Sequence, residues 1–391
     1  MYRVLVLDAN ERSALAIIRS LGRRGLAVVA GDRTAQALGA ASRYATAAVS
    51  YPDPSTAPGA FREEIAKIAE RMRIDLVVPA TDLTTMLLAT HPDRLRSARL
   101  AAPPADSYEA LTDKARLMTL AQELGVLVPE TRIVHTAAAA EEAAHELGFP
   151  IVLKPGRSRY LKGPHIISTS VQTVRSARQL ADTLPKLDWL GDIPCLVQRF
   201  VPGRGAGIFA LYDQSGPVTW FAHKRLREKP PTGGVSVLSE STDVDAEMLS
   251  AAKKLLSAAR WVGVAMVEFR VAPDGAPYLM EVNGRFWGSL QLAVDCGVDF
   301  PWLLCQVMRG LPVQGPASYV IGRRLRWLLG DLDSLILDVR RGAPHLRRIS
   351  GALGTFLKTF VDRSCRQEIF RISDPRPGMR EVRLWLEALR K

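Results

Sequence analysis

The most informative segment of the sequence is Val264-Ala-Met-Val-Glu-Phe-Arg-Val-Ala-Pro-Asp-Gly-Ala-Pro-Tyr-Leu-Met-Glu-Val-Asn283. Its two apolar runs flank Asp274 and Gly275, a pair that is a strong short-range signal for a β-hairpin. With these two residues at the centre of the turn, Glu268 on the first strand lies directly opposite Glu281 on the second. The sequence therefore predicts a hairpin that brings two carboxylates together.

Two facing carboxylates destabilise a sheet by repulsion, which indicates a cation between them. Asn283 lies two residues beyond Glu281 and shares its face, because side chains alternate along a strand. Oxygen donors of this kind suit Mg²⁺ or Mn²⁺, which also retain water and bind phosphates. Glu268, Glu281 and Asn283 are therefore the predicted metal ligands. The alternative is the solvent-facing side of an ordinary hairpin.

Three segments upstream of the hairpin add cations and a chain break. Lys154 closes an apolar run at residues 149–153, and Lys114 stands at the start of a helical pattern. A further strand-like run, at residues 196–201, ends at Pro202-Gly203. A lysine at a strand end or in a first helical turn is usually a solvated charge, so each segment alone is a weak signal.

In this order, the segments and the hairpin resemble the ATP-grasp superfamily, in its carboxylate–amine ligase branch. The layout is similar to that of biotin carboxylase and carbamoyl-phosphate synthetase domains, and the resemblance covers roughly residues 1–315. It implies that ATP and Mg²⁺ (or Mn²⁺) are the cofactors. It also implies that two lysines contact the ATP phosphates and that the backbone of a hinge segment contacts the edge of the adenine. The residues are Lys114 and Lys154 for the phosphates, and Gln198, Arg199, Phe200 and Val201 for the hinge.

The resemblance also implies cations for the transferring group and for the substrate. Arg285 looks like the arginine that neutralises the phosphoryl group or the substrate carboxylate. Lys224 or Arg225 is expected to bind the carboxylate to be activated, the arginine by a bidentate fork. The alternative is a plain exposed basic strand. The family often carries an acid where Gln198 stands, and the ribose-binding acid that often follows Pro-Gly is absent from residues 202–207.

The order of elements predicts an α/β chain in several parts. Strands at residues 3–7, 27–30 and 76–79 alternate with helices at 13–24 and 61–71, which indicates a Rossmann-like parallel sheet. A two-lobed ATP-grasp α+β domain and a basic, mostly helical extension follow. The predicted bounds are 1–108 for the N-terminal domain, 109–197 for the small or lid subdomain, 198–315 for the large subdomain with the metal site, and 316–391 for the extension.

Composition agrees with a cytoplasmic enzyme. The chain has 391 residues, of which 47% are hydrophobic and 24% charged, as in ordinary globular proteins. No apolar run reaches transmembrane length, and the start of the chain reads as a first strand without a cleavable apolar region. The four cysteines show no metal-type spacing and suit a reducing compartment.

The net charge of +12 suits an anionic ligand but is too diffuse to indicate a specific nucleic-acid partner. The C-terminal part concentrates this charge among Leu, Ile and Trp residues. The favoured interpretation is a basic amphipathic helical cap; the alternatives are a surface for an anionic partner or interfacial contact with a membrane. The residues are Arg323, Arg324, Arg326, Arg340, Arg341, Arg347 and Arg348.

The expected reaction is ATP-dependent ligation of a small-molecule carboxylate to an amine through an acyl phosphate, with release of ADP. Such chemistry depends on positioning and charge stabilisation, and no Ser-His-Asp or Cys-His set is evident. One alternative is a regulatory protein that binds ATP without turnover. Others are a different acceptor for the phosphoryl or carboxyl group, or a protein whose basic tail associates with anionic partners. A homodimer is an open option.

Overall fold

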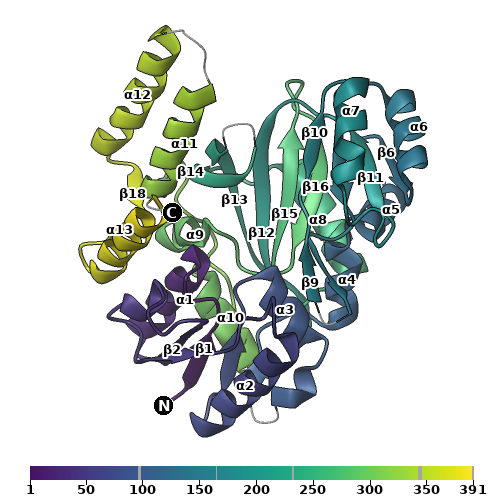
Figure 1. Cartoon of the computed structure of the whole chain (residues 1–391). Helices are drawn as coiled ribbons and strands as arrows, with labels where there is room; N and C mark the ends of the chain where they lie inside the picture. Colours follow the sequence, from purple (N-terminus) through teal and green to yellow (C-terminus); the bar gives the residue numbers. More distant parts are fainter. Residues whose placement is uncertain (96–97, 164, 231–232, 342–345, 390–391) are drawn as a thin grey trace.

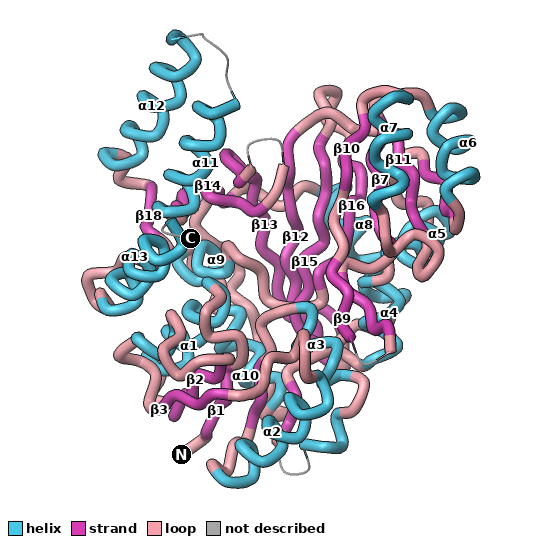
Figure 2. Tube along the Cα trace, viewed as in Figure 1, coloured by secondary structure: helices cyan, strands magenta, loops and turns pink. Residues whose placement is uncertain are grey.

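The computed structural model describes residues 1–95, 98–163, 165–230, 233–341 and 346–389. Three sheets of different character follow one another along the chain, with helices packed around them (Figure 1, Figure 2). A fourth, two-stranded ribbon lies in the second part of the chain.

The N-terminal sheet is parallel throughout, with the strand order β3-β2-β1-β4-β5. Its three central strands are short apolar runs, buried because helices cover the sheet. This confirms the predicted alternation of strands and helices. The elements are β1 (Arg3–Val6), α1 (Arg12–Arg23), β2 (Ala27–Asp32), η1 (Gly39–Ala41), β3 (Ala47–Ser50), α2 (Pro58–Arg71), β4 (Leu76–Val78), α3 (Asp82–Ala89), η2 (Pro92–Leu95) and β5 (Arg99–Leu100).

The second sheet has the strand order β10-β7-β11-β6, and its pairings are antiparallel. Its alanine-rich helix α6 covers one face with small side chains. The elements are α4 (Ala105–Thr112), α5 (Lys114–Glu123), β6 (Thr131–Val134), α6 (Ala137–Leu147), β7 (Ile151–Pro155), β8 (Arg159–Lys162), β9 (His165–Ser168), β10 (Gln172–Val174), α7 (Ala177–Thr183), η3 (Leu184–Lys186) and β11 (Cys195–Arg199).

The third sheet is the largest, with the strand order β16-β15-β12-β13-β14-β17-β18. Its last two strands belong to the C-terminal segment, so this segment shares a sheet with the part before it. The elements are β12 (Arg204–Asp213), β13 (Gly216–Lys229), β14 (Val235–Ser241), α8 (Ala246–Ala258), β15 (Gly263–Val271), β16 (Pro277–Asn283), α9 (Leu290–Asp295), α10 (Phe300–Met308), β17 (Arg324–Arg326), α11 (Leu328–Arg341), α12 (Leu346–Val361), β18 (Cys365–Gln367) and α13 (Arg376–Leu389).

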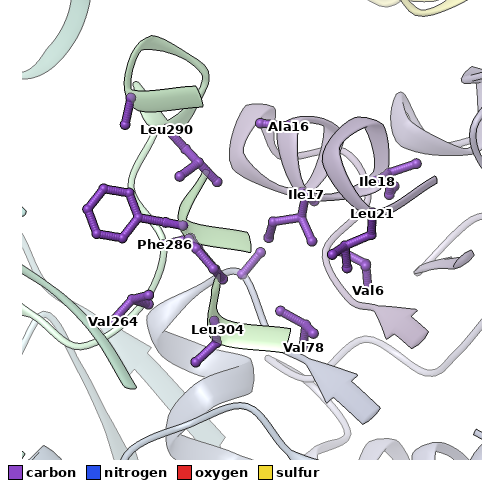
Figure 3. Packing of buried hydrophobic residues seen from close by; sticks show 14 of the residues in the cluster. Val6, Ala16, Ile17, Ile18, Leu21, Val78, Val264, Phe286, Leu290 and Leu304 are labelled. Carbon is purple, nitrogen blue, oxygen red and sulfur yellow. The ribbon is translucent and has the colours of Figure 1, made fainter. Parts of the chain in front are cut away.

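One continuous core joins the first sheet to the third. Ile17 and Val78 of the N-terminal part pack in the same cluster as Val264, Phe286 and Leu304 (Figure 3). Burial of such side chains from water is the main stabilising term in folding. The N-terminal part is therefore held firmly against the strands that carry the predicted metal ligands.

The C-terminal segment neutralises part of its own positive charge. Arg324 pairs with Glu240 and Asp362 at 2.6 and 2.9 Å, and the fully buried Arg326 pairs with Asp331 at 2.7 Å. The predicted basic cap therefore includes internal ion pairs. The side chains of Arg340, Arg341, Arg347 and Arg348 lie outside the described residues. Within the described part, no helix is both long and apolar enough to cross a membrane.

Candidate active site

The hairpin formed by β15 and β16 pairs the two predicted carboxylates as expected. Glu268 lies directly opposite Glu281, and Asn283 lies opposite Met266 on the same face of the sheet. Asn283 Nδ2 also donates to Glu281 Oε1 at 3.3 Å. The structure therefore brings the three predicted metal ligands onto one surface.

The turn of this hairpin differs from the predicted one. The backbone N–H of Ala272 donates to the Ala276 carbonyl, so the turn encloses three residues rather than two. Near the turn the strands are thus offset by one residue, with Val271 opposite Pro277. An irregularity between Glu268 and Phe269, at which β16 carries one extra residue, removes the offset. The predicted turn was wrong, and the predicted carboxylate pair was correct.

Two lysines from the second part of the chain approach Glu281. Lys114 begins α5, and its Nζ lies 3.5 Å from Glu281 Oε2 and 3.0 Å from Ser158 Oγ. Lys154 lies on β7, next to the sulfur of Met280 at 3.8 Å. Although burial opposes ionisation of Glu281, the charges of Lys114 and Lys154 hold the pKa of its carboxyl below the usual range.

The charged form of Lys154 is disfavoured at this position. Burial lowers the pKa of its ammonium to about 8, an effect that the Glu281 charge opposes and the Lys114 charge reinforces. A backbone hydrogen bond from Lys114 to the Gly156 carbonyl, at 2.8 Å, ties the loop after β7 to α5. Two cations are thus held close together, and phosphate oxygens would stabilise such an arrangement.

Glu268 is held by an arginine that crosses an intervening strand. Arg225 on β13 reaches over β12 and donates from Nη2 to Glu268 Oε2 at 2.6 Å. Gly205 makes room for this path, because a Cβ there would lie 3.0 Å from Arg225 Cδ. Arg225 Nη1 also binds Glu228 Oε1 at 3.0 Å. Burial and the Glu281 charge nevertheless raise the pKa of Glu268, although Arg225 lowers it.

Lys224 does not join this group. On β12, Ala206 lies opposite both Lys224 and Phe269, whereas Gly207 lies opposite Glu268. Side chains alternate between the two faces of a sheet, so Lys224 lies on the face away from Glu268. There its Nζ pairs with Glu240 at 2.6 Å. Of the two predicted carboxylate-binding cations of β13, the structure places only Arg225 at the site.

Arg285 follows β16 and binds a carboxylate from the N-terminal part. Its Nε and Nη2 donate to Asp82 Oδ2 at 3.1 and 3.0 Å, and Nη2 also donates to Asn283 Oδ1 at 3.2 Å. Although burial opposes the charge, the Asp82 carboxylate raises the pKa of the guanidinium. Asp82 stands at the end of a parallel strand, where ligands meet open sheets. That placement was its only signal in the sequence, and Asp82 was not among the predicted site residues.

The predicted hinge begins with the last two residues of β11, Gln198 and Arg199, and continues beyond the strand. Gln198 is buried, and its Nε2 donates to Thr131 Oγ1 at 2.9 Å, while its Oε1 has no hydrogen-bond partner among the described residues. The backbone N–H groups of Arg199 and Phe200 donate to Glu130 and Pro150 carbonyls. Because these two N–H groups already have partners, the adenine edge would be bound by the remaining backbone groups of this segment, including those of Val201.

A cavity of about 70 Å³ adjoins the cluster at the side facing the N-terminal part. Its lining combines charged and polar side chains with a few apolar ones. The charged and polar residues include Asp82, Lys114, Arg157, Ser158, Glu281 and Asn283. A second cavity, of about 430 Å³, lies between β12, β13 and the helices α11 and α12. Arg225 lines this second cavity and so connects it with Glu268.

The donor set fits a hard divalent cation that shares its coordination with a phosphate ligand. Across the part of the chain that the structure describes, no three or more His, Cys, Asp and Glu side chains gather as a metal cluster. Glu268, Glu281 and Asn283 instead supply two carboxylates and one amide. Mg²⁺ is commonly bound by one or two carboxylates together with substrate phosphates and water. Opposed carboxylates, one with a raised pKa, are a place where such a cation would be stabilising.

Comparison with known proteins points to the same family. Residues 194–329 match the family model described as an ATP-grasp in the biosynthetic pathway with Ter operon. A D-alanine–D-alanine ligase from Anaeromyxobacter dehalogenans is 26% identical over 212 residues, which is 51% of this chain and 66% of the relative. An arginine-specific carbamoyl phosphate synthase large chain from Halalkalibacterium halodurans is 27% identical over 206 residues, or 50% of this chain and 19% of the relative. The chain thus spans less than two thirds of either relative.

Solved structures agree with the fold. An ADP complex of N5-carboxyaminoimidazole ribonucleotide synthetase superimposes with a TM-score of 0.66 at 18% identity, covering 87% of this chain and 85% of the other. An L-amino acid ligase from Bacillus licheniformis superimposes with a TM-score of 0.62 at 18% identity, covering 80% and 75%. The Campylobacter jejuni biotin carboxylase gives 0.66 at 17%, covering 82% and 74%. The family match over residues 194–329 and the shared fold both indicate an ATP-grasp domain in this chain.

Proposed function

We propose that the protein is an ATP-dependent, ADP-forming ligase that joins a small-molecule carboxylate to an amine. The observation that carries the proposal is the convergence of Glu268, Glu281 and Asn283 with Lys114 and Lys154. The two opposed carboxylates, the lysine that begins α5 and the lysine on β7 form one charged surface. Such a surface can hold a metal–triphosphate, in which the negative charge is shared between a metal and ammonium groups.

Each residue has a defined task in this proposal. Glu268, Glu281 and Asn283 would hold Mg²⁺, which on binding offsets phosphate charge as phosphoryl transfer proceeds. Lys114 and Lys154 bind the phosphate oxygens, because two ammonium groups held close together are stabilised by an anion between them. The unpartnered Oε1 of the buried Gln198 can accept a hydrogen bond from the amino group of adenine.

The proposed reaction has two steps. An oxygen of the substrate carboxylate attacks the γ-phosphorus, the bond to the β-phosphate oxygen breaks, and ADP leaves. The nitrogen of the amine then attacks the acyl carbon of the acyl phosphate, inorganic phosphate leaves, and a proton is released from nitrogen. Arg225 and Arg285 stabilise the negative charge of the carboxylate and of the moving phosphoryl group by planar, bidentate contacts. No nucleophile of the protein is needed.

The experiment is a screen of the purified chain with Mg²⁺, ATP and pooled small carboxylates and amines. ADP release coupled to a new amide product, identified by mass spectrometry, is the expected result. Glu281→Gln should lose this activity, whereas Lys186→Met, on an exposed side chain, serves as a control that should keep it. Release of AMP and pyrophosphate would contradict the proposal, because it indicates an adenylate in place of an acyl phosphate.

The proposal also includes the cellular location, the kind of partner and the oligomeric state. We place the reaction in the cytoplasm, in keeping with four free cysteines, three of them buried. Both substrates are expected to be small molecules, with no specific nucleic-acid partner, and a homodimer is open to test by light scattering.

A further inference from the structure

The N-terminal part contributes one carboxylate to the active-site cavity, from Asp82. This residue is the first of α3, at the end of β4, and Thr81 caps the helix. Its side chain retains 36% of its exposure, and it lines the cavity beside Lys114, Ser158 and Glu281. Asp82 therefore meets the region where the phosphates and the acceptor are expected, although it lies 203 residues from Arg285 in the chain.

The contact between Asp82 and Arg285 uses only one carboxylate oxygen. Both guanidinium donors, Nε and Nη2, meet Oδ2, and no hydrogen bond to Oδ1 is present among the described residues. Arg285 is also anchored independently, because Nη1 donates to the Phe286 carbonyl at 2.9 Å and Nη2 to Asn283 Oδ1 at 3.2 Å. The guanidinium can therefore keep its place when Asp82 is no longer its partner.

An anionic substrate group and Asp82 would compete for the same two donors of Arg285. A substrate carboxylate or γ-phosphate that takes the Nε–Nη2 fork leaves the Asp82 carboxylate without its cation. A partly buried carboxylate without a counter-charge is unfavourable, so the cavity then favours a cation beside Asp82. The second substrate of the proposed reaction is an amine, which at neutral pH arrives as an ammonium ion.

We propose that Asp82 is the binding site for the protonated amine of the second substrate, and that it selects primary aliphatic amines such as the α-ammonium of an amino acid. The bound ammonium gives up one proton to water before its nitrogen attacks the acyl carbon, and the second proton leaves as the amide forms. The proposal rests on the ligase function proposed above. Met86, Tyr108 and Val282 line the same cavity and offer apolar contact for a short side chain. Exchange at Arg285 then links the two sites: binding of the anion to Arg285 prepares Asp82 for the ammonium.

The test uses two acceptors of different charge with the same activated carboxylate. One is the primary amine found in the product screen, and the other is hydroxylamine, which is uncharged at neutral pH and traps an acyl phosphate as a hydroxamate. Asp82→Asn should raise the KM for the primary amine roughly tenfold to hundredfold, as expected for loss of a charge-assisted contact. Hydroxamate formation should fall far less than amide formation, because hydroxylamine brings no positive charge to Asp82.

The matched control is Asp93→Asn, the same substitution at an exposed position of the same part of the chain, which should change neither acceptor. Asp82→Glu retains the charge and should recover most of the affinity for the amine, which guards against misreading a folding defect in Asp82→Asn. An equal loss with both acceptors would overturn the inference, because it assigns to Asp82 only the positioning of Arg285. An unchanged KM for the amine would overturn it as well. If the wild-type chain releases no ADP with any acceptor, the proposed ligase function fails, and this inference with it.

Discussion

Replacing Lys154 with methionine should stabilise the folded chain and at the same time weaken ATP binding. Lys154 extends from β7 toward Glu281, and burial lowers the pKa of its ammonium from the ordinary 10.5 to about 8. The charged form is therefore disfavoured in the folded chain by comparison with the unfolded one. Methionine has a similar length and no charge, and it can pack against the Met280 sulfur that now accepts a hydrogen bond from Lys154 Nζ at 3.8 Å.

The magnitude follows from the pKa difference. One pKa unit corresponds to about 1.4 kcal/mol, so the lowered pKa of Lys154 costs at most about 3 kcal/mol of stability where the group is charged in both states. Partial exposure to solvent reduces this figure, and about 1–3 kcal/mol is expected. Since the folded-state pKa lies below the unfolded one, the cost is fully present below pH 8. It falls as pH rises through the folded and then the unfolded pKa, and is gone above the latter.

Chemical unfolding of both proteins at pH 7 and near pH 10.5, without nucleotide, measures this effect. Lys154→Met should be more stable than the wild type at pH 7, and the difference should shrink at the higher pH. Calorimetry should show that the same variant loses most of its ATP affinity, whereas the exposed control Lys186→Met changes neither property. A variant less stable than the wild type at pH 7 would contradict the cost assigned to the buried charge. A variant that binds ATP normally would contradict the role of Lys154 in nucleotide binding.

Two further substitutions test contacts that hold the fold in place. Arg19→Met removes the partner of Asp374, whose side chain is fully buried and paired at 2.9 Å, and should cost about 3–5 kcal/mol in urea unfolding; a loss below about 1 kcal/mol would contradict this account of the C-terminal contact. Gly203→Ala should lower the melting temperature strongly, because its φ is +140° and a Cβ would lie 2.1 Å from the Val271 carbonyl oxygen. Gly125→Ala, at φ +65° with no atom near its Cβ, should cost only about 1 kcal/mol, and similar losses in the two glycine variants would disprove the steric argument.

Local patterns predicted the hairpin and the first sheet well. The alternation of apolar runs is a short-range property, and it placed β1, β2 and β4 as well as the β15–β16 pair. The opposition of Glu268 and Glu281 was predicted correctly although the turn was not, since a longer turn and an extra residue in β16 shift the register in opposite directions. Side-chain parity along a strand depends on every such irregularity, which apolar patterns do not reveal.

Long-range contacts could not be predicted in the same way. The face of Lys224 depends on how β13 pairs with β12, and the reach of Arg225 to Glu268 depends on a glycine in a strand between them. The pairing of Asp82 with Arg285 joins two parts of the chain that no local pattern connects. The expected division at residue 316 likewise gave no sign that β17 and β18 extend the large sheet.

Titration calorimetry of ATP with and without Mg²⁺ measures whether the face with Glu268, Glu281 and Asn283 binds a metal–nucleotide. For the wild type, Mg²⁺ should increase the affinity for ATP by at least about tenfold, as expected for the gain of a metal contact to phosphate. In Glu281→Gln this increase should vanish, while the affinity without metal holds or rises, because Lys114 and Lys154 lose a competing carboxylate. Equal dependence on Mg²⁺ in the two proteins would contradict the account.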